Sequence, residues 1–501
     1  MTLPPERQAG VLLHPTSLPG GGDLGPSARA FVDFLAASGF GVWQMLPVGP
    51  VHADGSPYMS PSSFAGNTGL ISPHDLFRLG LLPGDLDPGQ LEGAERHELL
   101  ERAHSALPDH PDHEHALALY REANAAWLVD YALFRCLGRR HGHIPSTQWP
   151  AAERARDPER LAEMQHELAQ EIELECLGQY LFAVQWQALH EYAANRGIRL
   201  FGDMPIYVAH NSADVWCHPE LFDLDDTGNP NEVAGVPPDA FAEDGQHWGN
   251  PVFRWDRHQQ EGFRWWIDRL GHQLRRFDLL RLDHFRGFEA FWAIPAGAES
   301  AAEGQWRQGP GTDLFNAVSE ALGPLPLVAE DLGEITPAVE SLRQSLGCPG
   351  MRVLQFAFEG DATNPHRPHN HGVDAVVYTG THDNDTTLGW WRNCSETTRA
   401  TATAYLAAPS DPMPWPLIQT ALNSVAQLAI IPAQDLMALG SEARMNTPGT
   451  TDGNWRWQLG TGEPPMELAP TLRYALSISG RAQAVTPSAY SPSPADAEDR
   501  D

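Results

Sequence analysis

Short apolar runs that end at turn residues occur eight times along this chain, and helical patterns lie between most of them. They are rich in leucine and β-branched residues, as is typical of strands buried on both faces. Strand–helix alternation predicts a parallel sheet with right-handed crossovers, and eight strands indicate an α/β fold, a (β/α)8 TIM barrel. The candidate strands are residues 10–18, 42–50, 198–209, 279–287, 326–333, 350–358, 375–383 and 428–439.

Two connections between these strands are too long for simple crossovers. Residues 51–197 separate the second and third strands, so we expect a mainly helical inserted subdomain over 51–175. Residues 210–260, rich in Pro, Gly, Asp and Asn, predict a long irregular loop insertion after strand 3. Residues 482–501 have the composition of a disordered tail. We therefore expect residues 1–481 to form a single decorated barrel.

Three of the runs end abruptly in acids, histidine and glycine. They are LLRLDHFRG (279–287), PLVAEDLG (326–333) and VVYTGTHDND (376–385). Asp283, Glu330 and Asp383 would therefore sit where strands give way to loops, which is where barrel enzymes keep their chemistry. Three acids with no lysine or cysteine partner indicate acid/base and carboxylate-nucleophile chemistry, most familiarly on glycosidic bonds.

Each acid has both a functional and a purely structural interpretation. Arg281 lies on the same strand face as Asp283 and would keep this carboxylate ionised, as a nucleophile requires, although a structural ion pair fits equally well. Glu330 precedes Asp331, whose like charge would raise a carboxyl pKa toward that of a proton donor; a helix cap or a solvated loop acid is the alternative. Asp383 lies in a polar cluster suited to sugar hydroxyls, or in a simple turn.

Composition excludes several classes of protein. The formal net charge of −32 disfavours nucleic acid and anionic membranes as partners. All 33 basic residues are arginine, so a lysine Schiff base or a phosphate-binding Walker lysine is excluded. An acidic surface of this kind also suggests adaptation to salt. Five scattered cysteines indicate reduced thiols, and the chain has neither a signal-peptide pattern nor an apolar run of about 18 residues, so a cytoplasmic location without a membrane span is expected.

Loop aromatic residues support a sugar substrate, because carbohydrate rings stack on aromatic faces. Tyr58, Phe241 and Trp248 lie in loop-like segments, where packing is the alternative explanation. Residues 20–25 fit GxGxxG, but Asp23 would face a pyrophosphate, so a nucleotide site is disfavoured. The acidic segment 223–234 lacks the final glutamate of a calcium loop. A histidine cluster at 110–115 is better explained as a solvated turn.

The ordered motifs resemble the 4-α-glucanotransferases (amylomaltases) of glycoside hydrolase family 77, in the α-amylase superfamily. The resemblance covers nearly the whole chain. Its carriers include GVLLHPTSLPG (10–20), SPY with FAGN (56–58, 64–67), GDMPIYVA (202–209), GVPPDAF with GQHWGNP (235–241, 245–251), RLDHFRG, AEDLG, GTHDNDT, and SEARMNTPG with GNW (441–449, 453–455).

The resemblance implies specific roles. Asp283 would be the nucleophile, Glu330 the acid/base and Asp383 the transition-state stabiliser. The sugar-binding residues that it implies are Ser56 and Tyr58, with Tyr58 on the donor side, Asp203, Arg281, His284 and His382 around the cleavage point, and Phe241, Gln246 and Trp248 over the acceptor side. The family needs neither a metal nor an organic cofactor.

The expected reaction is transfer of a 1,4-α-glucan segment to the 4-hydroxyl of another glucan, with retention. Retention predicts about 5 to 5.5 Å between the carboxyl groups of Asp283 and Glu330. The substrates would be maltooligosaccharides and linear α-glucans, and a monomer is favoured. Two alternatives stay open: an α-amylase-like retaining hydrolase with the same acids, and a non-catalytic glucan-binding protein.

Overall fold

Eight parallel strands form the centre of the molecule. The computed structural model describes residues 6–83, 96–238, 244–407, 410–460 and 464–483. In the sheet the strands follow the order β10-β11-β12-β1-β2-β3-β6-β9, and all ladders between neighbours are parallel. The strands are β1 (Gln8–Leu12), β2 (Val42–Gln44), β3 (Arg199–Met204), β6 (Leu279–Leu282), β9 (Leu327–Ala329), β10 (Gly350–Val353), β11 (Ala375–Tyr378) and β12 (Leu428–Pro432). The predicted barrel is confirmed.

The barrel is nearly closed between β9 and β10. In the part of the chain that the structure describes, no ladder joins these two strands, but the Ala329 amide donates to the carbonyl oxygen of Pro349 over 2.9 Å. Apolar side chains fill the interior, among them Phe201, Tyr378 and Ile430, all fully buried. This packed interior makes the barrel a rigid platform for the loops at its mouth.

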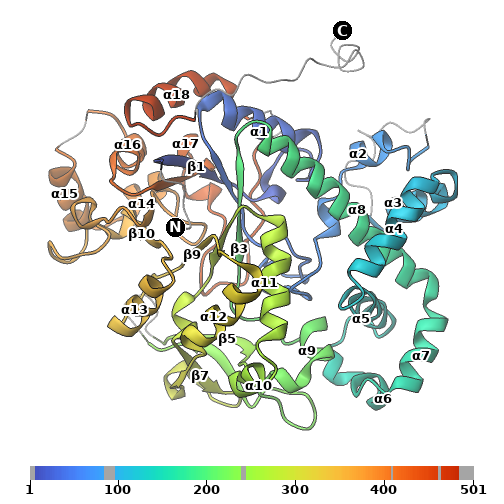
Figure 1. Ribbon diagram of the computed structural model, residues 1–501. Helices are drawn as coiled ribbons and strands as arrows, with labels where there is room; N and C mark the ends of the chain where they lie inside the picture. Colours follow the sequence, from blue (N-terminus) through green and yellow to red (C-terminus); the bar gives the residue numbers. More distant parts are fainter. Residues whose placement is uncertain (1–5, 84–95, 239–243, 408–409, 461–463, 484–501) are drawn as a thin grey trace.

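Helices surround the strands (Figure 1). Their apolar faces pack on the sheet because parallel strands are buried on both sides. The long α8 precedes β3, as expected of a helix that belongs to the barrel. The helices that follow or precede the barrel strands are α1 (Pro26–Ser38), α8 (Ala169–Ala194), α11 (Arg264–Arg276), α12 (Gly311–Leu322), α13 (Pro337–Ser345), α14 (Thr387–Asn393), α15 (Glu396–Tyr405), α16 (Trp415–Asn423), α17 (Ala433–Leu436) and α18 (Ala469–Ile478).

The connection between β2 and β3 carries a group of helices at one side of the barrel (Figure 1). Within the described ranges every element of this connection is helical. A separate apolar cluster, which includes Leu133, Leu137 and Met164, holds α5 and α7 against α8. Besides α8, its α-helices are α2 (Pro73–Arg78), α3 (Arg96–Ala106), α4 (Pro111–Ala123), α5 (Leu128–Arg140), α6 (Ala151–Arg154) and α7 (Pro158–Glu167).

Residues 210–260 differ from the irregular loop that their composition predicts. They contribute two helices, α9 (Ala213–Cys217) and α10 (Trp255–Gln260), and two strands, β4 (Glu232–Val236) and β5 (Gln246–Pro251). These strands join β7 (Ala290–Pro295) and β8 (Gln305–Gln308) in an antiparallel sheet of order β5-β4-β7-β8. At Gly235 an added Cβ would lie 2.2 Å from the Gln246 carbonyl oxygen, so glycine, normally a turn signal, here permits strand pairing.

Candidate active site

The guanidinium of Arg281 joins two carboxylates at the ends of neighbouring strands. Arg281 in β6 lies in register with Asp203 in β3. Its Nη1 donates to both oxygens of Asp203, over 2.8 and 2.7 Å, and its Nη2 lies 2.8 Å from Oδ1 of Asp283. Arg281 and Asp203 are buried, whereas the Asp283 side chain is 28% exposed. Asp283 is therefore a carboxylate open to a ligand and paired on one side with a buried cation.

Glu330 immediately follows β9, beside the end of β6. The ladder between the strands pairs Leu282 with Ala329, so Asp283 and Glu330 occupy the next positions in register. The separation of about 5 to 5.5 Å between their carboxyl groups that retention requires stays a prediction.

The two acids have different electrostatic surroundings. The amides of His284 and Leu332 donate to the two oxygens of Glu330, each over 2.8 Å. Burial raises the pKa of Glu330 to about 8; the charge of Asp283 also raises it, while that of Arg281 opposes the shift. Because its pKa is about 8, Glu330 is mostly protonated at neutral pH and can donate a proton.

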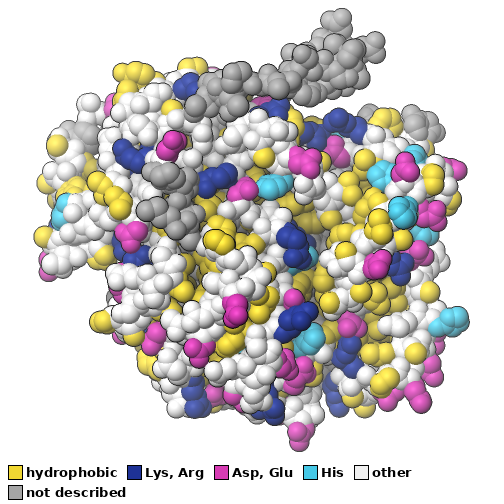
Figure 2. All heavy atoms as spheres, viewed as in Figure 1, with side chains coloured by type: hydrophobic (Ala, Val, Ile, Leu, Met, Phe, Trp, Pro, Cys, Tyr) yellow, Lys and Arg dark blue, Asp and Glu magenta, His cyan; other side chains and the backbone are white. Residues whose placement is uncertain are grey.

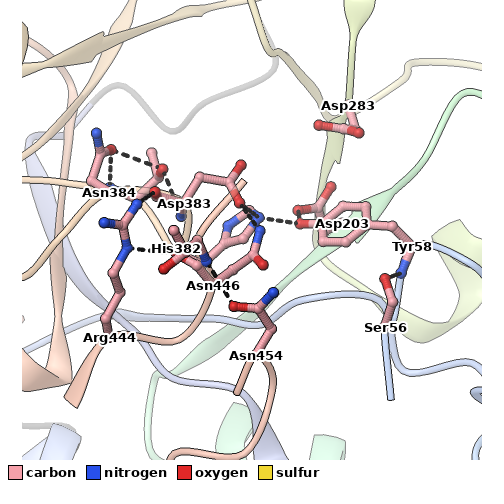
Figure 3. Close-up of polar contacts among 12 residues, drawn as sticks. Ser56, Tyr58, Asp203, Asp283, His382, Asp383, Asn384, Arg444, Asn446 and Asn454 are labelled. Carbon is pink, nitrogen blue, oxygen red and sulfur yellow. Dashed lines mark hydrogen bonds and ion pairs between the residues drawn. The ribbon is translucent and has the colours of Figure 1, made fainter. Parts of the chain in front are cut away.

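Tyr58 links Asp203 to His382 (Figure 3). The Tyr58 hydroxyl donates to Oδ2 of Asp203 over 2.8 Å and lies 2.9 Å from Nε2 of His382. The rings of Tyr58 and His382 stack with their centroids 5.2 Å apart. The Ser56 hydroxyl accepts the Tyr58 amide over 3.3 Å, which fixes the turn before the tyrosine. Tyr58 thus connects the SPY segment to the loop after β11, where His382 lies.

Asp383 is held by two residues for which the sequence analysis assigns no role (Figure 3). The Asn446 side-chain amide donates to Oδ1 of Asp383 over 2.6 Å, and Nη2 of Arg444 donates to the Asp383 carbonyl oxygen over 2.6 Å. His382 Nε2 lies 3.3 Å from the same carboxylate oxygen. The only signal for Arg444 and Asn446 in the sequence is their place in SEARMNTPG. The Asp383 side chain is thus oriented through one carboxylate oxygen, Oδ1, while 44% of the side chain stays exposed.

Aromatic side chains line the side of the mouth nearest the antiparallel sheet. The ring of Trp248 meets that of His284 edge to face with centroids 4.8 Å apart, and its Nε1 donates to Oε1 of Gln246 over 3.0 Å. His284 has a left-handed backbone with φ of 49°. Burial lowers the pKa of His284 to about 4, so the imidazole is neutral at pH 7. Phe241 lies outside the described residues.

Two cavities flank Tyr58 and His382. One, of about 440 Å³, is lined by His14, Ser17, Thr381, His382 and Arg444 among others. The second, of about 430 Å³, is lined by Tyr58, Ser60, Asp203, Tyr207 and Gln273 among others. The structure therefore brings the three acids and the described sugar-binding candidates to one mouth of the barrel, with open space on both sides of the Tyr58–His382 stack.

Among the described residues no group of three or more His, Cys, Asp and Glu side chains is arranged to hold a metal ion. In the same ranges no helix is long and apolar enough to cross a membrane. His113 of the histidine cluster has its Nδ1 2.8 Å from the Tyr180 hydroxyl.

Comparisons with known proteins agree on one family. The family model described as 4-alpha-glucanotransferase matches residues 13–462. A 4-alpha-glucanotransferase of Thermus thermophilus is 48% identical over 494 residues, covering 94% of this chain and 98% of that protein. A chloroplastic/amyloplastic 4-alpha-glucanotransferase of Solanum tuberosum is 42% identical, covering 95% and 86%. The amylomaltase of Streptococcus agalactiae in complex with acarbose superimposes with a TM-score of 0.90 at 36% identity, covering 95% of this chain and 100% of that one. The chain therefore belongs to the 4-alpha-glucanotransferase family, glycoside hydrolase family 77, and is an enzyme of glucan transglycosylation.

Proposed function

We propose that this enzyme transfers 1,4-α-glucan segments by retaining double displacement, with Asp283 as nucleophile and Glu330 as acid/base. The observation that carries the proposal is that two carboxyl groups on neighbouring strands have opposite electrostatic surroundings. Asp283 is partly exposed and lies 2.8 Å from the buried guanidinium of Arg281, whereas Glu330 is buried, and burial raises its pKa so that it is protonated at neutral pH.

In the first step an oxygen of Asp283 forms a bond to the anomeric carbon while the bond from that carbon to the leaving oxygen breaks. Glu330 gives its proton to the leaving oxygen, and the product is a glycosyl ester of Asp283. The charge of Asp283, which raises the pKa of Glu330, disappears in this ester. The pKa of Glu330 consequently falls, which prepares its carboxylate to act as a base.

In the second step the 4-hydroxyl of an acceptor glucan attacks the anomeric carbon. Glu330 takes the hydroxyl proton, the ester bond breaks, and Asp283 is released as a carboxylate. Transfer exceeds hydrolysis when an acceptor sugar displaces water from this position. We assign that role to Gln246 and Trp248, together with Phe241, because the Trp248 ring lies against His284 beside the catalytic loop.

The remaining residues are proposed to hold the donor sugar. Asp383 would bind hydroxyls of the distorted ring. Asn446 orients the Asp383 carboxylate, and 44% of the Asp383 side chain is exposed. His382 and Arg281 would border the same sugar. His284 is also suited to a hydroxyl, because its Nε2 is buried without a hydrogen-bond partner in the described part of the chain. Ser56 and Tyr58 would line the donor side, with Asp203 fixing Tyr58 and Arg281 from below.

The substrates are proposed to be maltooligosaccharides and linear α-glucans. The amylomaltase of Streptococcus agalactiae was solved in complex with acarbose, and its fold and 36% identity support a related ligand here. A maltotriose digest tests this: glucose together with oligomers longer than maltotriose is the expected result. Products no longer than maltotriose would instead favour a hydrolase, and no turnover would favour a glucan-binding protein.

The roles of the acids are tested with two donors. Maltotriose needs a proton on its leaving group, whereas a maltosyl fluoride does not, because fluoride leaves as an anion. We expect Glu330→Gln to lose about 10² to 10⁴-fold of its activity on maltotriose and to retain a rapid first release of fluoride, about one equivalent per enzyme, because with this donor only the second step needs Glu330. Asp283→Asn should lose activity on both donors. Wild-type maltotriose turnover by either variant would contradict the assignment.

We further propose a cytoplasmic location for the enzyme. All five cysteines are free in the structure, as suits a reducing compartment. Cell fractionation with an activity assay tests this, and activity found mainly in a membrane or secreted fraction would contradict it. The monomeric state stays a prediction, which size-exclusion chromatography with light scattering would check.

A further inference from the structure

The place where the barrel lacks a ladder lies beside the proposed acid/base. Between β9 and β10, called the β9–β10 seam below, the carboxylate of Asp331 supplies hydrogen bonds that other strand pairs obtain from their backbones. Its Oδ1 accepts the amide of Met351 over 2.5 Å and its Oδ2 accepts Nη1 of Arg352 over 3.1 Å. Nε of Arg343 lies 3.8 Å from Oδ2. The side chain of Asp331, which follows β9, is thus hydrogen-bonded to the second and third residues of β10, Met351 and Arg352.

Gly350, the first residue of β10, has no side chain and leaves space for this contact. A Cβ at this position would lie 2.2 Å from Oδ2 and 2.8 Å from Cγ of Asp331. Separations of this size cannot be accommodated without moving the carboxylate. The glycine therefore leaves room for Asp331 to reach the Met351 amide, and only 6% of Asp331 is exposed.

Asp331 and Glu330 are consecutive and reach opposite neighbours. Glu330 accepts the His284 amide, which follows β6, whereas Asp331 accepts the Met351 amide in β10. Consecutive side chains of an extended chain point to opposite sides. We propose that Asp331 is a positioning residue for Glu330. By bonding to β10, Asp331 closes the β9–β10 seam and fixes the backbone that directs the Glu330 side chain toward the substrate. This inference rests on the acid/base role proposed above for Glu330.

The charge of Asp331 adds a second, measurable effect. The charged groups that bear on Glu330 are Arg281 and Asp283 from β6 and its loop, and Asp331 from its own loop; Asp331 contributes to the raised pKa of Glu330. Removing the Asp331 charge should lower that pKa. Because Glu330 must be protonated to act as an acid, activity would then decline at a lower pH on the alkaline side of the pH profile.

Three variants separate positioning from general stability. Asp331→Asn retains an oxygen for the Met351 amide but lacks the charge, Asp331→Ala lacks both, and Gly350→Ala displaces an intact carboxylate. Gly138→Ala in α5 is the matched control, because a Cβ there meets nothing within 4 Å. The folded full-length chains are checked by circular dichroism. From pH 5 to pH 10, kcat and KM are measured on maltotriose, and the rate of the first fluoride release is measured on maltosyl fluoride.

We expect Asp331→Asn to move the alkaline limb of kcat to lower pH, because a neighbouring negative charge raises the pKa of a carboxyl group. Asp331→Ala and Gly350→Ala should lose about 10²-fold in kcat on maltotriose, with KM near the parent value. The loss in the rate of the first fluoride release should be much smaller, because that step needs no proton from Glu330. Gly138→Ala should match the parent.

An unmoved alkaline limb in Asp331→Asn together with parent kcat in Gly350→Ala would overturn the inference. Equal losses in kcat on maltotriose and in the first fluoride release would also overturn it, since they would indicate a general disturbance of the barrel. If Asp331→Ala does not fold, the other two variants decide. Failure of the acid/base assignment itself is recognised separately, as full activity of Glu330→Gln on maltotriose.

Discussion

Replacing Glu330 with glutamine should make the stability of the variant, relative to the parent, increase with pH while removing activity. Burial raises the pKa of this carboxyl from 4.5 to about 8. As the pH rises through this window, the unfolded chain releases the proton first, so the folded state, which retains it, loses stability. Each pH unit is worth about 1.4 kcal/mol, and the whole window therefore costs about 5 kcal/mol. Glutamine cannot ionise and avoids this cost.

The assay is urea unfolding of the parent chain and of Glu330→Gln at pH 5 and pH 8, analysed by linear extrapolation. Relative to the parent, the variant should gain most of those 5 kcal/mol between the two pH values, because other titrating groups cancel in the comparison. Glu261→Gln, at an exposed position, should show no such gain. A stability difference between Glu330→Gln and the parent that does not change with pH would refute the reasoning.

Four further outcomes are expected. Asp283→Asn should lose maltotriose turnover but still bind glucan by calorimetry; loss of binding as well would argue against a catalytic role. Tyr58→Phe removes a hydrogen bond to a buried carboxylate, worth about 1.5 to 3 kcal/mol, and should lower kcat/KM about ten- to a hundredfold. Arg481→Met leaves five buried carbonyl interactions unmade and should destabilise the chain by about 3 kcal/mol or more, seen as a lower urea midpoint. With a net charge of −32, the melting temperature should rise from about 0.01 M to 1 M salt, which shortens the screening length from about 30 to 3 Å; a flat curve would exclude salt adaptation.

The charge argument concerns the surface as a whole. Acidic and arginine side chains are interspersed over the face seen in Figure 2. Since the acids outnumber the arginines by 65 to 33, local pairing leaves a large excess of unpaired negative charge. Salt weakens the repulsion within that excess, and it also weakens the attraction within exposed ion pairs.

The barrel was predictable because its strands are buried on both faces. Seven of the predicted runs contain a strand of the structure, and the run 10–18 overlaps β1, which begins earlier, at Gln8. All the runs extend past the ends of their strands, since apolar loop residues at the mouth continue the pattern. In 428–439, for example, the strand ends at Pro432 and α17 follows. Burial by a turn or a short helix gives the same local signal as burial by a strand.

The antiparallel sheet could not be predicted by the same reasoning. All four residues of β8 are exposed, so no apolar alternation marks the strand. Strands β4 and β5 contain glycine, proline and asparagine, which are typical of loops. Their partner strands, β7 and β8, come from a different connection. Strand pairing of this kind depends on long-range contacts that leave little trace in the local sequence.

The site was predictable where chemistry and strand ends coincide, and less so elsewhere. Asp283 and Glu330 follow apolar strands directly, and the structure brings them together. Arg444 and Asn446 lie in a segment without a regular strand, and only the structure reveals that they hold Asp383. The sequence also offered no sign that Asp331 reaches across to β10.

The antiparallel sheet has a consequence for the exchange of parts between related enzymes. Strands β4 and β5 belong to the connection after β3, and β7 and β8 to the connection after β6, so two separate stretches of chain build one structure. A cassette of residues 210–260 moved alone into another barrel would carry Gln246 and Trp248 without half of their supporting sheet. Substitutions in one stretch must therefore stay compatible with the other stretch. In a chimera, residues 210–260 and 288–310 should be exchanged together.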